Sequence, residues 1–285
     1  MPGSSAWRAA VARLPPPRRR VPRNIRSEFL SPAAPRVFAH RGLAVEAPEN
    51  TLLAFAQAIA AGASYIETDV HSSADGVAII AHDADLSRVA GRNVRVDQLT
   101  AAELGKIDLG HGQYFCTLAQ ALDSFPETRF NIDVKSAPAV SPTIATVQKF
   151  DASQRVIVTS FNERRRSAVA HGLPGVASSA SAARLLPALL AARFGAVFLV
   201  RWALRGLVAV QVPEKAAGIT VTRPAVIRAF HAAGVEVHVW TVNDPARMRE
   251  LLALGVDGII TDRADLALAV VADLTGPDLN RTDPN

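Results

Sequence analysis

Short apolar runs alternate with longer segments of helical periodicity from residue 36 onward. Runs of four to eight apolar residues bounded by turn residues are typical of buried strands, whereas apolar positions three and four residues apart are typical of helices. The predicted strands are residues 36–40, 64–70, 77–82, 130–135, 155–161, 175–180, 207–212, 235–242 and 256–262. The main predicted helices are residues 48–63, 162–173, 181–195, 223–234 and 244–255. The order of elements is therefore a regular alternation of strand and helix.

The Asp75-Gly76 pair lies between the second and third predicted strands and is a strong hairpin signal. We therefore expect residues 77–82 to fold back against the second strand, which leaves eight parallel strands. This pattern predicts an α/β fold of the (β/α)8 TIM-barrel type, with a β-hairpin after the second strand. An open doubly wound sheet is the alternative, but no GxGxxG turn follows the first strand.

Charge is unevenly distributed along the chain. Residues 1–36 carry eight arginines and one acid, whereas the remainder carries 23 basic and 25 acidic residues. The body is thus nearly neutral, which argues against nucleic acid as a partner. We predict a disordered basic N-terminal arm over residues 1–35, a barrel domain over residues 36–272 and a disordered C-terminal tail over residues 273–285. A solvated arm is the simplest interpretation, and peripheral contact with an anionic membrane is the alternative.

No signal peptide or membrane-spanning segment is evident in the sequence. The most apolar stretch, Leu185–Val210, is interrupted by one proline and three arginines, which favours a core helix followed by a strand. A surface that touches lipid is the alternative for this stretch. The one cysteine, Cys116, excludes an intrachain disulfide and agrees with a reducing compartment. We expect a cytoplasmic protein whose membrane contact, if present, is peripheral.

Polar residues that are costly to bury lie toward the C-terminal ends of several predicted strands or just after them. They are His40, Arg41, Glu67, Asp69, His82, Asp133, Lys135, Ser160 and the segment 240–243. In a (β/α)8 barrel the C-terminal ends of the strands form one rim, and catalytic groups lie there. We therefore expect these side chains to share one site.

Glu67, Asp69 and Asp133 supply three carboxylates from two predicted strands. Oxygen ligands around an open site suit Mg²⁺, Ca²⁺ or Mn²⁺. Without a cation, three adjacent carboxylates would raise one another's pKa values. The sequence therefore predicts a divalent-cation site, with local pairing to Arg or Lys as the alternative.

His40 and His82 end two strands that we expect to be close in space. Two imidazoles on either side of a phosphorus atom can divide proton removal and proton donation. Arg41 and Lys135 add fixed positive charge, which favours a phosphate-bearing ligand and a phosphoryl-transfer transition state. The chain has no GxxxxGK[ST] loop and no GxSxG motif, which argues against P-loop nucleotide hydrolysis and serine hydrolase chemistry.

The ordered set of motifs resembles the glycerophosphodiester phosphodiesterases of the PLC-like phosphodiesterase superfamily, over roughly His40 to Ala264. The matching elements are His40-Arg41-Gly42, PENT at Pro48–Thr51, Glu67-x-Asp69, Asp75-Gly76, His82-Asp83 with Leu86 and Arg88, NIDVK at Asn131–Lys135, Ser160-Phe161, QVP at Gln211–Pro213, VWTVN at Val239–Asn243 and GVDGIITD at Gly255–Asp262. Each motif alone is weak, but the ordered combination is highly specific.

The resemblance implies metal-dependent hydrolysis of glycerophosphodiesters to glycerol 3-phosphate and an alcohol. It implies His40 and His82 as general acid and base, Glu67, Asp69 and Asp133 as ligands of one divalent cation (Mg²⁺ or Ca²⁺, with Mn²⁺ as an alternative), Arg41, Lys135, Phe161 and Trp240 as substrate-binding residues, and Glu49 and Asn50 as supporting residues. Asp133 departs from the family pattern, where this acid is often Glu; the shorter side chain can change metal preference or recruit a water ligand. A second departure, FCTL at Phe115–Leu118 where the family often reads IPTL, is expected to alter local packing.

Two other functions stay open. A lysophospholipase D that accepts one acyl chain is suggested by the apolar Leu185–Val210 stretch and the basic arm. A barrel that binds a phosphorylated ligand without turnover is disfavoured because every matched catalytic position is filled. The sequence also leaves open whether water attacks phosphorus directly or opens a cyclic phosphate first formed by the glycerol 2-hydroxyl.

Overall fold

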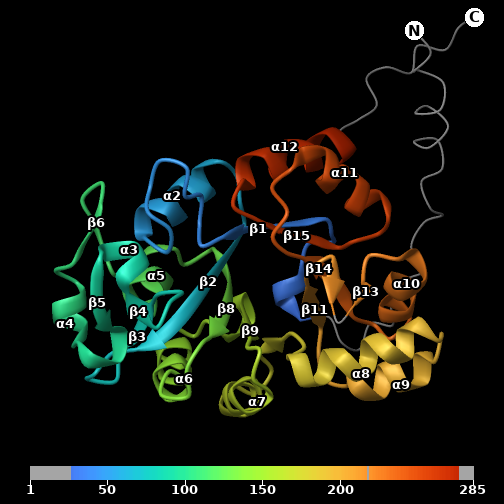
Figure 1. The fold of residues 1–285 in the computed structure, drawn as a ribbon, viewed down its shortest axis with the longest axis horizontal. Helices are drawn as coiled ribbons and strands as arrows, with labels where there is room; N and C mark the ends of the chain where they lie inside the picture. Colours follow the sequence, from blue (N-terminus) through green and yellow to red (C-terminus); the bar gives the residue numbers. More distant parts are fainter. Residues whose placement is uncertain (1–26, 217, 276–285) are drawn as a thin grey trace, which may run out of the picture.

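The predicted strands pair in parallel in the computed structural model, which describes residues 27–216 and 218–275 (Figure 1). The parallel strands are β1 (Arg36–His40), β2 (Tyr65–Ser72), β8 (Arg129–Val134), β9 (Val156–Thr159), β10 (Ala177–Ser178), β11 (Ala209–Val212), β14 (Glu236–Val239) and β15 (Gly258–Thr261). Their order in the sheet is β10-β9-β8-β2-β1-β15-β14-β11. A parallel bridge between Ser179 and Ala209 brings the two ends of this order together. The predicted (β/α)8 barrel is confirmed, and the doubly wound sheet is excluded.

Helices follow the strands and cover the outside of the barrel (Figure 1). They are α2 (Leu52–Ala60), α5 (Leu118–Ser124), α6 (Val140–Lys149), α7 (Glu163–Gly172), α8 (Ala182–Arg193), α9 (Val197–Ala203), α10 (Pro224–Ala232), α11 (Pro245–Ala253) and α12 (Ala264–Thr275). Two short helices, α3 (Ser87–Ala90) and α4 (Ala101–Leu104), lie in the insertion described below. Thr51 caps the start of α2, because its hydroxyl accepts a hydrogen bond from the Ala54 amide. No helix in the described ranges is both long enough and apolar enough to cross a membrane.

The apolar stretch Leu185–Val210 forms two helices and a strand, instead of the single helix and strand that we expected. The first helix, α8, ends shortly before Gly195, which adopts a φ of +71°. A left-handed residue cannot continue a right-handed helix, so the chain turns there and starts α9. The two helices pack side by side on the outside of the barrel (Figure 1).

The expected hairpin is present, because β3 (Ala78–Ile80) pairs antiparallel with β2. An insertion that the sequence pattern did not predict as a unit follows it, before α5 begins. It contains α3, α4 and four short strands: β4 (Asp85–Leu86), β5 (Arg92–Arg95), β6 (Asp108–Gly110) and β7 (Gln113–Tyr114). Its small apolar cluster includes Leu86, Leu104 and Phe115. A further short hairpin, β12 (Lys215–Ala216) with β13 (Ile219–Thr220), precedes α10.

The folded region begins before residue 36, where the sequence placed its start. Phe29 is fully buried against Tyr65, with their rings 5.3 Å apart in an edge-to-face arrangement. Nearby, Arg36 on β1 pairs with Glu236 on β14 at 2.8 Å. Because these residues start their strands, they close the N-terminal end of the barrel and leave the other end for the site. The rest of the predicted arm (1–26) and most of the predicted tail (276–285) lie outside the described residues.

A tight turn after β1 sets the direction of the side chains at the start of the site. Gly42 has a φ of +87°, and a Cβ atom there would lie 2.7 Å from the carbonyl carbon of Ala54 in α2. Only glycine combines this backbone conformation with this close approach. The turn therefore holds His40 and Arg41 against the first helix of the barrel.

We expect Gly42→Ala to lower the free energy of unfolding by about 2–4 kcal/mol, since it adds both left-handed strain and a backbone clash. The matched control is Gly76→Ala, because Gly76 also has a positive φ (+74°) but faces open space. The control should cost about 1–2 kcal/mol. Urea denaturation of both variants measures the difference, and equal losses would contradict the proposed close approach.

Candidate active site

The strand register brings the predicted polar residues to one end of the barrel. Glu67 and Asp69 are two residues apart on β2 and therefore point to the same side. His40 is the register partner of Glu67, and Asp69 is the register partner of Asp133 on β8. A cavity of about 490 Å³ opens at this end. It is lined by His40, Arg41, Glu67, Asp69, His82, Asp133, Lys135, Phe161 and Trp240, together with other residues of the strand ends.

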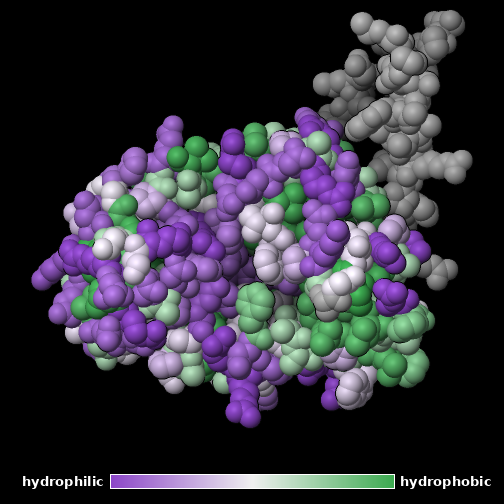
Figure 2. Space-filling view, viewed as in Figure 1, coloured by the Kyte–Doolittle hydropathy of each residue, from purple (hydrophilic) through white to green (hydrophobic). Residues whose placement is uncertain are grey.

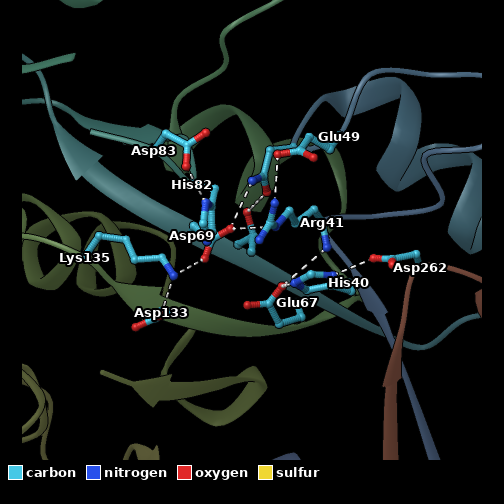
Figure 3. Close-up of polar contacts among 12 residues, drawn as sticks. His40, Arg41, Glu49, Glu67, Asp69, His82, Asp83, Asp133, Lys135 and Asp262 are labelled. Carbon is cyan, nitrogen blue, oxygen red and sulfur yellow. Dashed lines mark hydrogen bonds and ion pairs between the residues drawn. The ribbon is translucent and has the colours of Figure 1, made fainter. Parts of the chain in front are cut away.

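Lys135 lies between two of the three carboxylates (Figure 3). Its Nζ atom is 2.7 Å from Asp69 Oδ1 and 2.7 Å from Asp133 Oδ2. Burial would lower the pKa of Lys135, but the two carboxylates raise it overall, so the ammonium stays charged. Burial likewise acts to raise the pKa of Asp69, yet the neighbouring Lys135 holds it below its ordinary value. The alternative of local pairing with a lysine is therefore present for these two acids.

Glu67 is the carboxylate without a cationic partner at hydrogen-bond distance. Its Oε2 atom is 3.8 Å from His40 Nε2 and accepts a hydrogen bond from the Arg41 amide at 3.3 Å. Burial and the negative charge of Asp69 raise the pKa of Glu67 to about 8. Burial also raises the pKa of Asp133. The site thus carries more carboxylate than its own cations neutralise.

His40 is held by an acid that the sequence analysis had not assigned to the site. Its Nδ1 atom is 2.6 Å from Asp262 Oδ1, at the end of β15. Burial acts to lower the pKa of His40, but the bond to Asp262 and the charge of Glu67 raise it above its ordinary value. Asn243 donates to the other carboxylate oxygen of Asp262 at 2.7 Å. The bond at Nδ1 leaves Nε2 directed toward Glu67 and the cavity.

His82 lines the same cavity and has its own acidic partner (Figure 3). Its Nδ1 atom is 2.7 Å from Asp83 Oδ1. Arg88 donates to Asp83 at 2.6 Å and makes two bonds to Glu49, at 2.6 and 3.1 Å. Burial would raise the pKa of Asp83, but His82 and Arg88 lower it, so the carboxylate stays ionised beside the imidazole. The insertion that carries Asp83 and Arg88 therefore fixes the orientation of His82.

Two residues of the PENT motif, Glu49 and Asn50, hydrogen-bond to residues that line the cavity. Glu49 accepts a bond from Arg41 at 3.0 Å, in addition to those from Arg88. Asn50 donates to Asp69 Oδ2 at 3.1 Å and accepts from Thr68 at 2.8 Å. Neither Glu49 nor Asn50 belongs to the set of residues that line the cavity. Glu49 and Asn50 therefore contact the residues that line the cavity, and their supporting role stays a prediction.

The carboxylates fit a divalent cation by their chemistry. The Oδ1 atom of Asp133 is buried and has no hydrogen-bond partner, and burial, together with the negative charge of Asp69, raises the pKa of Glu67. Hard oxygen donors with excess negative charge suit Mg²⁺, Ca²⁺ or Mn²⁺. Across residues 27–216 and 218–275, however, no three His, Cys, Asp or Glu side chains already converge in a geometry that could hold a metal ion. Lys135 occupies the space between Asp69 and Asp133 instead.

One wall of the cavity is apolar. The rings of Phe161 and Trp240 meet edge to face, with their centroids 6.1 Å apart. Leu185 and Ala182 of α8 continue this wall. The cavity therefore offers charged groups on one side and an apolar surface on the other, which suits a polar headgroup attached to a less polar part.

The sequence predicts the groups that face the cavity, but it assigns no role to the groups that orient them. Those groups are Asp262, Asp83 and Arg88, which all belong to the motifs that resemble the family. The position of Asp262 directly after a predicted strand is the one signal that could have indicated its role. His238, a further histidine on β14, is fully buried inside the barrel, with its ring 4.8 Å from that of Phe38 and Nε2 3.1 Å from Glu236. It belongs to the barrel interior and does not line the cavity.

Comparison with known proteins shows which protein family this chain is similar to. The family model described as "Glycerophosphoryl diester phosphodiesterase family" matches residues 40–266. A curated relative from Mycobacterium tuberculosis, named "Probable glycerophosphodiester phosphodiesterase 2", is 43% identical over 241 residues, which cover 84% of this chain and 91% of the relative.

Solved structures agree in fold. A glycerophosphodiester phosphodiesterase from Agrobacterium tumefaciens superposes with a TM-score of 0.70 at 27% identity, over 83% of this chain and 99% of its own. A phosphodiesterase from Oleispira antarctica, solved in complex with the product sn-glycerol-3-phosphate, gives a TM-score of 0.68 at 23% identity, over 84% and 97%. The resemblance found in the sequence is therefore shown by both the family model and the fold.

We expect Asp262→Asn to lower the pKa of His40, because the substitution removes the carboxylate that favours the imidazolium. An NMR titration of the His40 ring protons measures this shift. Asp83→Asn is the matched control, since it removes the carboxylate next to the other histidine and should leave the His40 titration in place. A His40 pKa that is the same in Asp262→Asn as in the unmodified protein would contradict this pairing.

Proposed function

The chain belongs to the glycerophosphoryl diester phosphodiesterase family, and from that premise we propose that it hydrolyses glycerophosphodiesters to glycerol 3-phosphate and an alcohol in a reaction that depends on one divalent cation. Because the chain belongs to this family, it is a phosphodiester hydrolase, and its substrate is a small glycerophosphodiester. Glycerol 3-phosphate as the product agrees with the ligand named for the Oleispira antarctica phosphodiesterase. The choice of alcohol is left open.

The proposal rests mainly on one observation. His40 and His82, three carboxylates and two cationic side chains line the same cavity; Glu67 and Asp69 come from within β2, and the others lie at the C-terminal end of a strand or in the segment after it. A phosphodiester bound there would meet imidazole on two sides and positive charge beside its oxygens. This arrangement supplies the groups that phosphoryl transfer needs.

We assign the role of general acid to His40. Its pKa is raised, so it carries the proton that the departing alkoxide oxygen needs. Asp262 holds the ring at Nδ1, and Nε2 is then the atom that delivers the proton. His82, oriented by Asp83, faces the same cavity and is left to accept the proton of the attacking hydroxyl group. The attacking group is either water or the glycerol 2-hydroxyl.

Arg41 and Lys135 bind and orient the phosphate in this proposal. Both line the cavity beside the carboxylates. Arg41 is itself oriented by Glu49 at 3.0 Å, so its guanidinium is held before substrate arrives. Phe161 and Trp240 contact the part of the substrate that extends from the phosphate.

We propose Glu67, Asp69 and Asp133 as the residues that hold the divalent cation, in line with the unpartnered Asp133 oxygen and the raised pKa of Glu67. When bound, such a cation would polarise the phosphoryl oxygens and offset the negative charge of the transition state. Its identity among Mg²⁺, Ca²⁺ and Mn²⁺ is left to a metal titration.

A second candidate function is a lysophospholipase D. The observation that favours it is the apolar wall of the cavity, where Leu185 of α8 lies near Phe161 and Trp240. This wall has room for the first carbons of an acyl chain. Rates on glycerophosphocholine and on lysophosphatidylcholine, measured side by side, separate the two candidates.

We expect purified protein with a divalent cation to release glycerol 3-phosphate from glycerophosphocholine, and His40→Ala and His82→Ala each to lower kcat by about 10²–10⁴-fold. A coupled assay for glycerol 3-phosphate provides the measurement, with circular dichroism to confirm folding. The matched control is His171→Ala, because His171 is an exposed histidine on α7 and does not line the cavity. Full turnover in both site variants would remove the two histidines from the mechanism.

The raised pKa of Glu67 predicts that the stability of the fold depends on pH, and this can be measured without an assay of turnover. With a pKa of about 8 against an ordinary value of 4.5, folded Glu67 binds its proton more tightly than the unfolded chain does. In EDTA, Glu67 therefore stabilises the fold fully at low pH and loses that stabilisation between pH 4.5 and 8, by at most about 1.4 kcal/mol per pH unit. Glu67→Gln should show a flatter decline over this range.

Thermal unfolding of both proteins between pH 4.5 and 8 measures this difference. Adding Mg²⁺, Ca²⁺ or Mn²⁺ at pH 8 should raise the Tm of the unmodified protein and raise that of Glu67→Gln much less. Parallel pH curves for the two proteins would contradict the raised pKa, and equal Tm gains on adding metal would exclude Glu67 as a ligand.

A further inference from the structure

A continuous apolar surface covers the outer side of α8 and α9. Six large apolar side chains are exposed there: Leu186, Leu190, Phe194, Phe198, Leu199 and Trp202. The three aromatic residues are 80%, 72% and 70% exposed, so most of their ring surface faces solvent. Figure 2 shows this apolar patch at the lower right, over α8 and α9, whereas the surface over α3 and α4 is mostly hydrophilic. We call these six residues the α8–α9 face.

The charged side chains of the segment that carries this face are all basic. No Asp or Glu occurs between Glu163 and Glu214, a segment that contains both helices. Arg193, Arg201 and Arg205 are exposed on α8, on α9 and just after α9. Large apolar patches on a protein surface usually mark an interaction site, and a rim of one charge indicates a partner of the opposite charge.

We propose that the α8–α9 face docks this enzyme onto an anionic lipid bilayer. Phe, Leu and Trp side chains with arginines beside them are the composition of segments that lie in the membrane interface, where the rings enter the acyl region and the guanidinium groups meet lipid phosphates. A second copy of this chain fits less well, because it would bring arginines of both copies together with no acid from either segment to pair with them.

The position of the face relative to the cavity supports a role in substrate access. Ala182 and Leu185, in the first turn of α8, line the cavity, and the exposed residues continue along the same helix. The 12 residues of α8 span about 18 Å. Docking through this face would therefore hold the cavity within about one helix length of the bilayer. This role in access depends on the proposed function, whereas docking itself does not.

Vesicle binding tests the proposal without any assay of turnover. Full-length protein is sedimented with phosphatidylcholine vesicles that contain phosphatidylserine, and with vesicles of phosphatidylcholine alone. We expect stronger partition to the anionic vesicles, and at least a tenfold loss when Phe194, Phe198 and Trp202 are all changed to Ser. Arg193→Glu with Arg205→Glu should also weaken partition by about tenfold. Leu274→Ser, a half-exposed leucine on α12, is the matched control and should bind like the unmodified protein.

Two outcomes would overturn the proposal. If the triple Ser variant binds anionic vesicles as tightly as the unmodified protein, another segment, such as the arginine-rich residues 1–26, makes the contact. If no vesicle binds and light scattering shows a dimer that the triple variant loses, the face joins two copies of the chain. Because these residues do not line the cavity, hydrolysis of glycerophosphocholine without vesicles should be unchanged in the triple variant, which separates failure of docking from failure of the proposed function.

Discussion

The site depends on how three carboxylates are kept close together at the mouth of the barrel. The pairing of β1 with β2 and of β2 with β8 forces Glu67, Asp69 and Asp133 into one small volume. Such a cluster is unfavourable without positive charge, and Lys135 supplies part of it through two contacts of 2.7 Å. Glu67 has no such cationic contact, and burial together with the negative charge of Asp69 raises its pKa. The raised pKa of His40 follows in part from this cluster, and the proposed binding of a cation and of phosphate depends on it as well.

The two histidines occupy different electrostatic surroundings although both pair with an aspartate at Nδ1. His40 lies against the carboxylate cluster, which favours its protonated form together with Asp262. His82 is carried by the segment after the hairpin and is oriented by Asp83, which Arg88 in turn holds. One fixed strand end and one inserted segment thus supply the two imidazoles. The difference between their surroundings is the basis for assigning them different roles in proton transfer.

The cavity and the outer surface share one element, the α8 helix. Its first turn contributes to the apolar wall of the cavity, and its later turns expose apolar side chains to solvent. A helix that is apolar on both its inner and outer sides is unusual for the surface of a barrel. Membership in a phosphodiesterase family explains the inner side, since substrate needs a wall. The outer side needs a partner, and an anionic bilayer accounts for both its apolar character and its arginines.

Local pattern in the sequence determined the eight parallel strands, the hairpin after Asp75-Gly76 and the set of polar residues at the strand ends, because periodicity and turn chemistry act over a few residues. The strands of the insertion between β3 and α5 escaped prediction because they are only two to four residues long. Phe29, which packs under the barrel, carried no periodic signal. The partners that orient the site were decided by tertiary structure alone: Asp262 meets His40 across 222 residues, and Arg88 meets Glu49 across 39. Such contacts exist only once the strands have closed into a barrel, since nothing in the local sequence records which distant carboxylate will face a given imidazole.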